Sequence, residues 1–205
     1  MLEDFYSNFV FLLRWLHIMS GITWIGLLYF FNFVNGPFQA KLDKELKPSV
    51  NPLLMPRALW WFRWGAMMTF IFGLLLFFVK YMQPGMFHDE DGGVTSRAMW
   101  IMMGMTFGTI MWFNVWFIIW PAQKKLIKWT RDRQSPAEMP ALAKRAATAS
   151  KINTYLSAPM LFAMIAPNNY ASFSWLALVV VVVIGETVIW SLYKIAPKVG
   201  TSIPE

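Results

Sequence analysis

The stretch that decides the fold is FSWLALVVVVVIGETVIWSLY, residues 173–193. It contains five consecutive valines and a single charged side chain, Glu186. Coiled as an α-helix, a run of this length extends about 32 Å, enough to cross the hydrocarbon core of a bilayer. The stretch therefore predicts a membrane-spanning helix.

Four further stretches extend this prediction to the rest of the chain. Clear apolar runs occupy residues 9–34, 58–79 and 98–120. A fourth stretch, 148–167, is apolar only in its second half, which is too short to span alone. Because it continues an alanine-rich, helix-favouring segment, we predict a short span, kinked at Pro159 and buried among the others.

The distribution of charge favours five spans over four. Of the 18 Lys and Arg residues, 14 lie in the loops 35–57 and 121–151 and in the tail that follows residue 193. Five spans place all three basic segments on one side, as is typical of cytoplasmic loops. We therefore predict an all-α integral membrane protein. It is a single domain, residues 1–205, with five transmembrane helices, an N-terminus on the outer side of the membrane and a cytoplasmic C-terminus.

The composition excludes several classes of protein. The chain has no Cys, which excludes a disulfide scaffold, a thiolate metal site, an iron–sulfur cluster and a covalently attached c-type haem. Hydrophobic residues make up 57% and charged residues 14%, which excludes a disordered chain. The net charge of +7 is explained by membrane orientation. We expect the lipid bilayer, and no nucleic acid, as a partner.

Ionisable residues inside the spans are candidates for function, because a charge in hydrocarbon is costly. Arg14 and His17 are three residues apart and share a helix face that Gly21 and Trp24 extend. A neutral imidazole there can bind haem iron or a copper ion, or relay protons, and Gly21 leaves room for a porphyrin edge. These four residues are the predicted cofactor-binding site, with His17 as the metal ligand. The alternative is that His17 only hydrogen-bonds a neighbouring helix.

Glu186 lies about 20 Å into the last span, near the bilayer midplane. An ionised carboxylate there needs a partner, and Arg14, Arg63 and His17 are the available ones. Such a pair can serve as a catalytic proton relay or can only hold the bundle together. Both alternatives stay open. Arg14 and Arg63 lie near helix ends, which favours a structural role for both.

Small residues form stripes on two of the predicted helices. Gly65, Thr69 and Gly73 recur at four-residue spacing in one, and Gly104 and Gly108 do so in another. This spacing is typical of faces where membrane helices approach closely. We therefore predict helix–helix contacts at both stripes.

Three longer stretches have a recognisable pattern. They read RWLHIMSGITWIG at 14–26, NVWFIIWPAQKK at 114–125 and ASKINTYLSAPML at 149–161. Together and in this order they resemble the membrane domain of the bacterial membrane-bound urate oxidase (urate hydroxylase) family. In that family a longer membrane domain precedes a cytochrome c domain, which passes electrons to a terminal oxidase.

The resemblance implies a shortened relative of that family. Without Cys the chain cannot carry the attached cytochrome, and the turn at 168–170 lacks the histidine expected there. We therefore expect a subunit of an electron-transfer or respiratory complex in the bacterial inner membrane, with its N-terminus in the periplasm. Its expected partners are other membrane subunits, a c-type cytochrome or a terminal oxidase. It would contribute a proton-relay residue or a wall beside a haem or quinone; the expected cofactor is haem b, and the alternative is that no cofactor binds. The acidic outer loop 88–93 can attract a basic cytochrome c.

Two other functions remain open at this stage, so the sequence leaves undecided whether the chain is an enzyme. One is a membrane oxidoreductase that acts on urate or a similar small substrate and passes electrons to cytochrome c. Such chemistry requires a cofactor, because these side chains cannot supply it. The other is a small transporter, which requires a polar path through the membrane.

Overall fold

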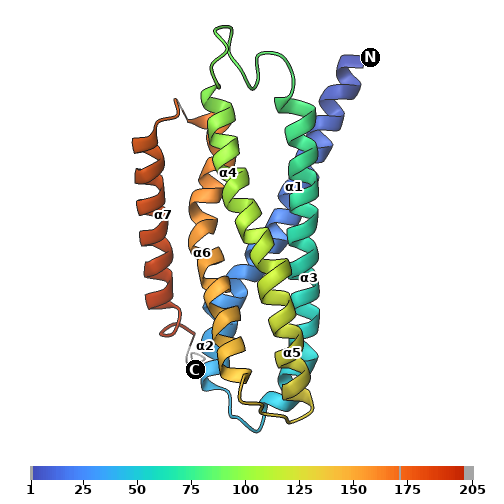
Figure 1. The fold of residues 1–205 in the computed structure, drawn as a ribbon, viewed down its shortest axis with the longest axis vertical. Helices are drawn as coiled ribbons and strands as arrows, with labels where there is room; N and C mark the ends of the chain where they lie inside the picture. Colours follow the sequence, from blue (N-terminus) through green and yellow to red (C-terminus); the bar gives the residue numbers. More distant parts are fainter. Residues whose placement is uncertain (1, 171, 201–205) are drawn as a thin grey trace.

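The computed structural model describes residues 2–170 and 172–200, which form a helical bundle. Figure 1 shows the long helices lying side by side, with their connections gathered at the two ends. No strand occurs in these residues, so the predicted all-α class is confirmed for them.

The first two long helices each contain a π-helical segment, where the helical turn widens by one residue. In the first, α1 (Leu2–Tyr29) passes through η1 (Phe30–Asn35) into α2 (Gly36–Lys41) without a break. In the second, α3 (Lys47–Leu76) ends in η2 (Phe77–Tyr81).

The remaining chain forms three more helices. In the third, α4 (Ser96–Phe113) continues through η3 (Asn114–Ile119) into α5 (Trp120–Arg131). The last two are α6 (Met139–Asn169) and α7 (Trp175–Ile195). Both α4 and α7 begin at capping hydroxyls, because Thr95 and Ser174 each accept a hydrogen bond from a backbone N–H three residues on.

Among the described residues, four helices are long and apolar enough to cross a membrane. They are the helices built on α1, α3, α4 with α5, and α7. The fifth, α6, passes between α4 and α7 and contributes many small buried residues, as predicted for a helix packed inside the bundle. It is continuous through Pro159. That α6 crosses the membrane, and that it kinks at Pro159, remain predictions.

The helices extend beyond the apolar runs that predicted them. The expected loop 35–57 is reduced to residues 42–46, because α3 already begins at Lys47. Pro48 lies in the first turn of α3, where a missing backbone N–H costs nothing. The apolar pattern identified the spans but not the polar turns that prolong them.

The bundle is held by two close helix pairs, α1 with α3 and α4 with α6. A Cβ built at Gly65 would lie 3.1 Å from the backbone nitrogen of Trp24. One built at Gly104 would lie 3.2 Å from Cε of Met164. Gly65 and Gly104 therefore lie at helix–helix contacts, as predicted, whereas a Cβ at Gly108 would meet nothing within 4 Å. By contrast, α7 lies at the edge of the bundle, where it packs mainly on α6.

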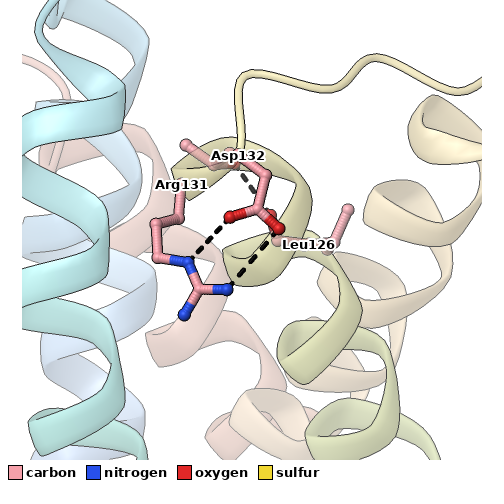
Figure 2. A network of polar contacts seen from close by, with 4 residues as sticks. Leu126, Arg131 and Asp132 are labelled. Carbon is pink, nitrogen blue, oxygen red and sulfur yellow. Dashed lines mark hydrogen bonds and ion pairs between the residues drawn. The ribbon is translucent and has the colours of Figure 1, made fainter.

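The connections alternate between the ends of the bundle. The N-terminal end of α1, the connection 82–95 and the start of α7 lie at one end, and α2, α5 and the end of the described chain lie at the other. At the second end, the Nε atom of Arg131 lies 2.8 Å from a carboxylate oxygen of Asp132 (Figure 2). This hydrogen bond holds the pKa of Asp132 below its usual value. Because Asp132 is exposed, the pair contributes little to stability.

Candidate functional site

His17 is fixed between α1 and α3. Its Nδ1 atom lies 2.9 Å from the backbone oxygen of Thr69. Since a carbonyl only accepts hydrogen bonds, Nδ1 is the donor, and the neutral ring carries its lone pair on Nε2. The contact depends on Gly73, where a Cβ would lie 3.0 Å from Cε1 of His17. The glycine of the predicted stripe therefore makes room for the imidazole.

His17 lines a cavity of about 50 Å³, here called the His17 cavity. The lining side chains come from α1, α3, α4 and α6, and nearly all are apolar. Three of the lining residues are methionines, Met105, Met160 and Met164. Trp24 also lines the cavity, and the Nε1 atom of its buried indole has no hydrogen-bond partner. The predicted pairing of His17 and Trp24 on one face is therefore realised.

Gly21 and Arg14 lie outside this cavity. A Cβ at Gly21 would stand 3.9 Å from the methyl group of Thr69, so this glycine lies at the contact between α1 and α3. The side chain of Arg14 is exposed, one helical turn outward from His17. Of the four predicted cofactor-binding residues, only His17 and Trp24 line one space.

Glu186 is separate from the His17 cavity. Its side chain is exposed on α7, at the edge of the bundle. No hydrogen bond or ion pair joins it to His17, Arg14 or Arg63 in the described part of the chain. The pairing expected from the sequence is therefore not formed. The high cost of a charge in hydrocarbon implies that a partner is needed, but it does not determine which face of α7 bears the carboxylate.

Arg63 lies among indole rings instead of extending freely to the interface. Its Cζ atom is 4.0 Å from the ring centroid of Trp120 and 5.1 Å from that of Trp116. Its Nε atom is buried without a hydrogen-bond partner. Cation–π contacts of this kind contribute roughly 0.5–2 kcal/mol each, the larger values where the groups are desolvated. Arg63 therefore joins α3 to η3 and α5.

Sequence reasoning missed a buried polar network centred on α6. Asn153 is fully buried, accepts a hydrogen bond from Nδ2 of Asn114 at 2.8 Å and donates one to the backbone oxygen of Met111 at 2.9 Å. Asn114 is the first residue of η3, so the network satisfies polar groups where the helical turn changes.

A second set of hydrogen bonds joins α6 to the first helix and connects that helix to α7. The hydroxyl oxygens of Tyr29 and Ser157 are 2.9 Å apart. Asn32 donates to Ser150 at 2.9 Å and accepts from the hydroxyl of Tyr193 at 2.8 Å. The signal in the sequence was the spacing of Ser150 and Ser157, two helical turns apart on one face of α6. Uncharged polar residues of this kind are less conspicuous in an apolar sequence than an ionisable residue is.

The outer loop is a turn closed by its own acidic residue. Asp89 accepts a hydrogen bond from the backbone nitrogen of Gly93 at 2.6 Å. His88 and Val94 form an isolated bridge across the turn. No group of three His, Cys, Asp or Glu residues suited to a metal ion occurs among the described side chains of residues 4–170 and 172–200. The loop is therefore an acidic turn that Asp89 closes at Gly93.

The His17 cavity can hold a small group but not a porphyrin. Sites for cofactor-sized ligands usually enclose about 300–1,000 Å³, whereas this cavity encloses about 50 Å³. That is space for a few water molecules or one ion. Haem b, the cofactor expected from the sequence, therefore does not fit inside the cavity.

Comparison with known proteins identifies the family of the chain. A search of curated proteins and a search of solved structures gave no match. The family described as urate oxidase N-terminal matches residues 90–198, just over half of the chain. The match includes the stretches at 114–125 and 149–161 that carried the resemblance, and it leaves out 14–26. The chain therefore belongs to the urate oxidase N-terminal family.

Proposed function

We propose that the chain is an inner-membrane subunit of a bacterial electron-transfer complex of the urate oxidase type. The observation that carries this proposal is His17, an imidazole of fixed tautomer lining a cavity within an apolar helix. Membership of the urate oxidase N-terminal family supplies the class of complex. The name of the family suggests urate or a similar small substrate for the assembled complex.

In this proposal the haem belongs to partner subunits, because a porphyrin does not fit inside the His17 cavity. The chain contributes the wall beside that haem or beside a quinone. When bound in the complex, such a group supplies the one-electron chemistry that these side chains lack. When no metal ion occupies Nε2, His17 would accept or donate a proton at that atom, since Nδ1 is occupied by its bond to Thr69.

The proposed orientation places the basic end of the bundle in the cytoplasm. The ends of α2 and α5 carry many of the lysines and arginines and lie at the same end as the tail. The acidic turn at 89–91 lies at the other end and would face the periplasm. Charge complementarity there favours a basic c-type cytochrome as the electron acceptor.

In this proposal Glu186 lies at the contact between this chain and a partner subunit. An exposed carboxylate near the bilayer midplane is costly until a donor covers it. A partner helix packed on α7 would supply that donor, and only then can Glu186 relay a proton.

The test is to purify the tagged chain in mild detergent from bacterial membranes and record oxidised and reduced optical spectra. We expect haem-containing subunits to co-purify, and urate to reduce that haem under anaerobic conditions. His17→Ala should lower urate-dependent reduction while leaving co-purification intact. His88→Ala, at the only other histidine, is the matched control. Purification of a colourless chain without haem-containing partners would overturn the proposal.

A further inference from the structure

We propose that the His17 cavity binds a copper(I) ion. The proposed ligands are Nε2 of His17 and the thioether sulfurs of Met105, Met160 and Met164, because all four residues line the same cavity. This inference rests on the proposed function in taking that cavity as the working site. Its test measures metal binding, so its failure is distinguishable from a failure of the electron-transfer role.

The His17 imidazole makes the hydrogen bond that usually orients a metal-binding histidine. Metal-binding histidines usually donate their second ring N–H to a carboxylate or a backbone carbonyl, which fixes the tautomer and the ring orientation. His17 has this arrangement, because Nδ1 donates to the backbone oxygen of Thr69 at 2.9 Å. Nε2 keeps its lone pair and makes no hydrogen bond with another described residue. The hydrogen bond that orients a metal-binding histidine is therefore present before any ion binds.

The three methionines reach the cavity from two other helices. Met105 lies on α4, and Met160 and Met164 lie on α6, one turn apart. Met160 is buried, and Met164 is packed against Gly104, where an added Cβ would lie 3.3 Å from its sulfur. Methionine usually serves as an adaptable core residue. Here three methionines line the same small cavity as His17, the only histidine within the apolar helices.

The ligands available in the His17 cavity favour a soft metal ion of low charge. Thioether sulfur and imidazole nitrogen suit Cu(I), whereas Mg²⁺, Ca²⁺ and Mn²⁺ prefer carboxylate, carbonyl and water ligands. No carboxylate lines the cavity, so every donor is neutral. In an apolar site without a compensating anion, a monovalent ion costs less to bury than a divalent one. The cavity of about 50 Å³ has space for an ion and not for a large cofactor.

The experiment is an anaerobic titration of the purified full chain in detergent with Cu(I), in competition with a chromogenic copper(I) chelator. We expect one ion per chain, and X-ray absorption should show both nitrogen and sulfur ligands. His17→Ala should weaken binding at least tenfold. Met160→Leu and Met164→Leu conserve volume and should each weaken it several-fold.

Matched controls keep the inference falsifiable. Met102→Leu changes an exposed methionine on α4, and His88→Ala changes the other histidine, so neither should alter the affinity. Circular dichroism establishes that each variant is folded. If His17→Ala does not fold, the two leucine variants decide the outcome.

Three outcomes would overturn the inference. They are the absence of stoichiometric Cu(I) binding, affinity that His17→Ala and both leucine variants leave unchanged, and a bound ion without sulfur ligands. If copper binding fails while urate still reduces the co-purified haem, the ion assignment is wrong and the proposed function stands.

Discussion

The position of His17 can be tested by adding a single methyl group, in Gly73→Ala. The new Cβ would lie 3.0 Å from Cε1 and 3.2 Å from Nδ1 of His17. Contacts this short between non-bonded heavy atoms are repulsive, so the ring must move. Because the ring is held at the same time by its 2.9 Å bond to Thr69, that movement weakens the bond.

The expected cost combines three effects. Overpacking a well-packed contact costs about 1–3 kcal/mol. A hydrogen bond between membrane helices contributes about 0.6 kcal/mol on average and up to about 1.7 kcal/mol. Alanine in place of glycine favours the helix by up to about 1 kcal/mol. The unfolding free energy of Gly73→Ala should therefore fall by about 1–4 kcal/mol.

The control for this prediction is Gly26→Ala, also in an apolar helix. A Cβ at residue 26 meets nothing within 4 Å, so only the helix-favouring effect remains, and this variant should be as stable as the parent or slightly more stable. Stability is measured by SDS titration in mixed micelles, followed by far-UV circular dichroism. If Gly73→Ala is as stable as Gly26→Ala, His17 is not held where we place it.

Three further predictions concern other parts of the bundle. Asn153→Ala removes two buried hydrogen bonds and should cost about 1–3 kcal/mol of unfolding free energy, whereas Asn169→Ala, at the exposed end of α6, should cost less than about 0.5 kcal/mol by the same SDS titration. Arg63→Leu removes the cation between the indole rings and should shift the tryptophan fluorescence and lower stability by about 1–2 kcal/mol; an unchanged emission spectrum would contradict the packing. Glu186→Gln should alter complex assembly or activity more than His88→Ala, as judged by native gel electrophoresis and urate-dependent haem reduction. If both variants behave like the parent, Glu186 has no role at a subunit contact.

The sequence predicts those parts of the fold that depend on periodicity within one helix. The pairing of His17 with Trp24 follows from their seven-residue spacing, which is two turns of an α-helix. The contact stripe of Gly65, Thr69 and Gly73 follows from the same rule, and the structure confirms it. The apolar runs identify the helices that can cross a membrane, because composition and length alone decide that property.

Features that depend on contacts between helices could not be predicted in this way. The three methionines of the His17 cavity look like apolar filling until α4 and α6 are placed beside α1. Glu186 was expected to face a basic partner within the chain, whereas α7 packs at the edge and leaves the carboxylate exposed. The bond between Asn114 and Asn153 joins residues 39 positions apart, and neither residue carries a charge that would single it out.

The π-helical segment η3 has a consequence for sequence length. A π-turn accommodates one extra residue, so side chains beyond it are rotated by about 100° relative to an uninterrupted α-helix. This rotation sets the direction of Trp120, whose ring lies 4.0 Å from Arg63. Deleting one residue from Asn114–Ile119 would restore the α-helical turn and direct Trp120 elsewhere. A relative shorter by one residue at this point would thus present a different face of α5 while keeping the same amino acids along it.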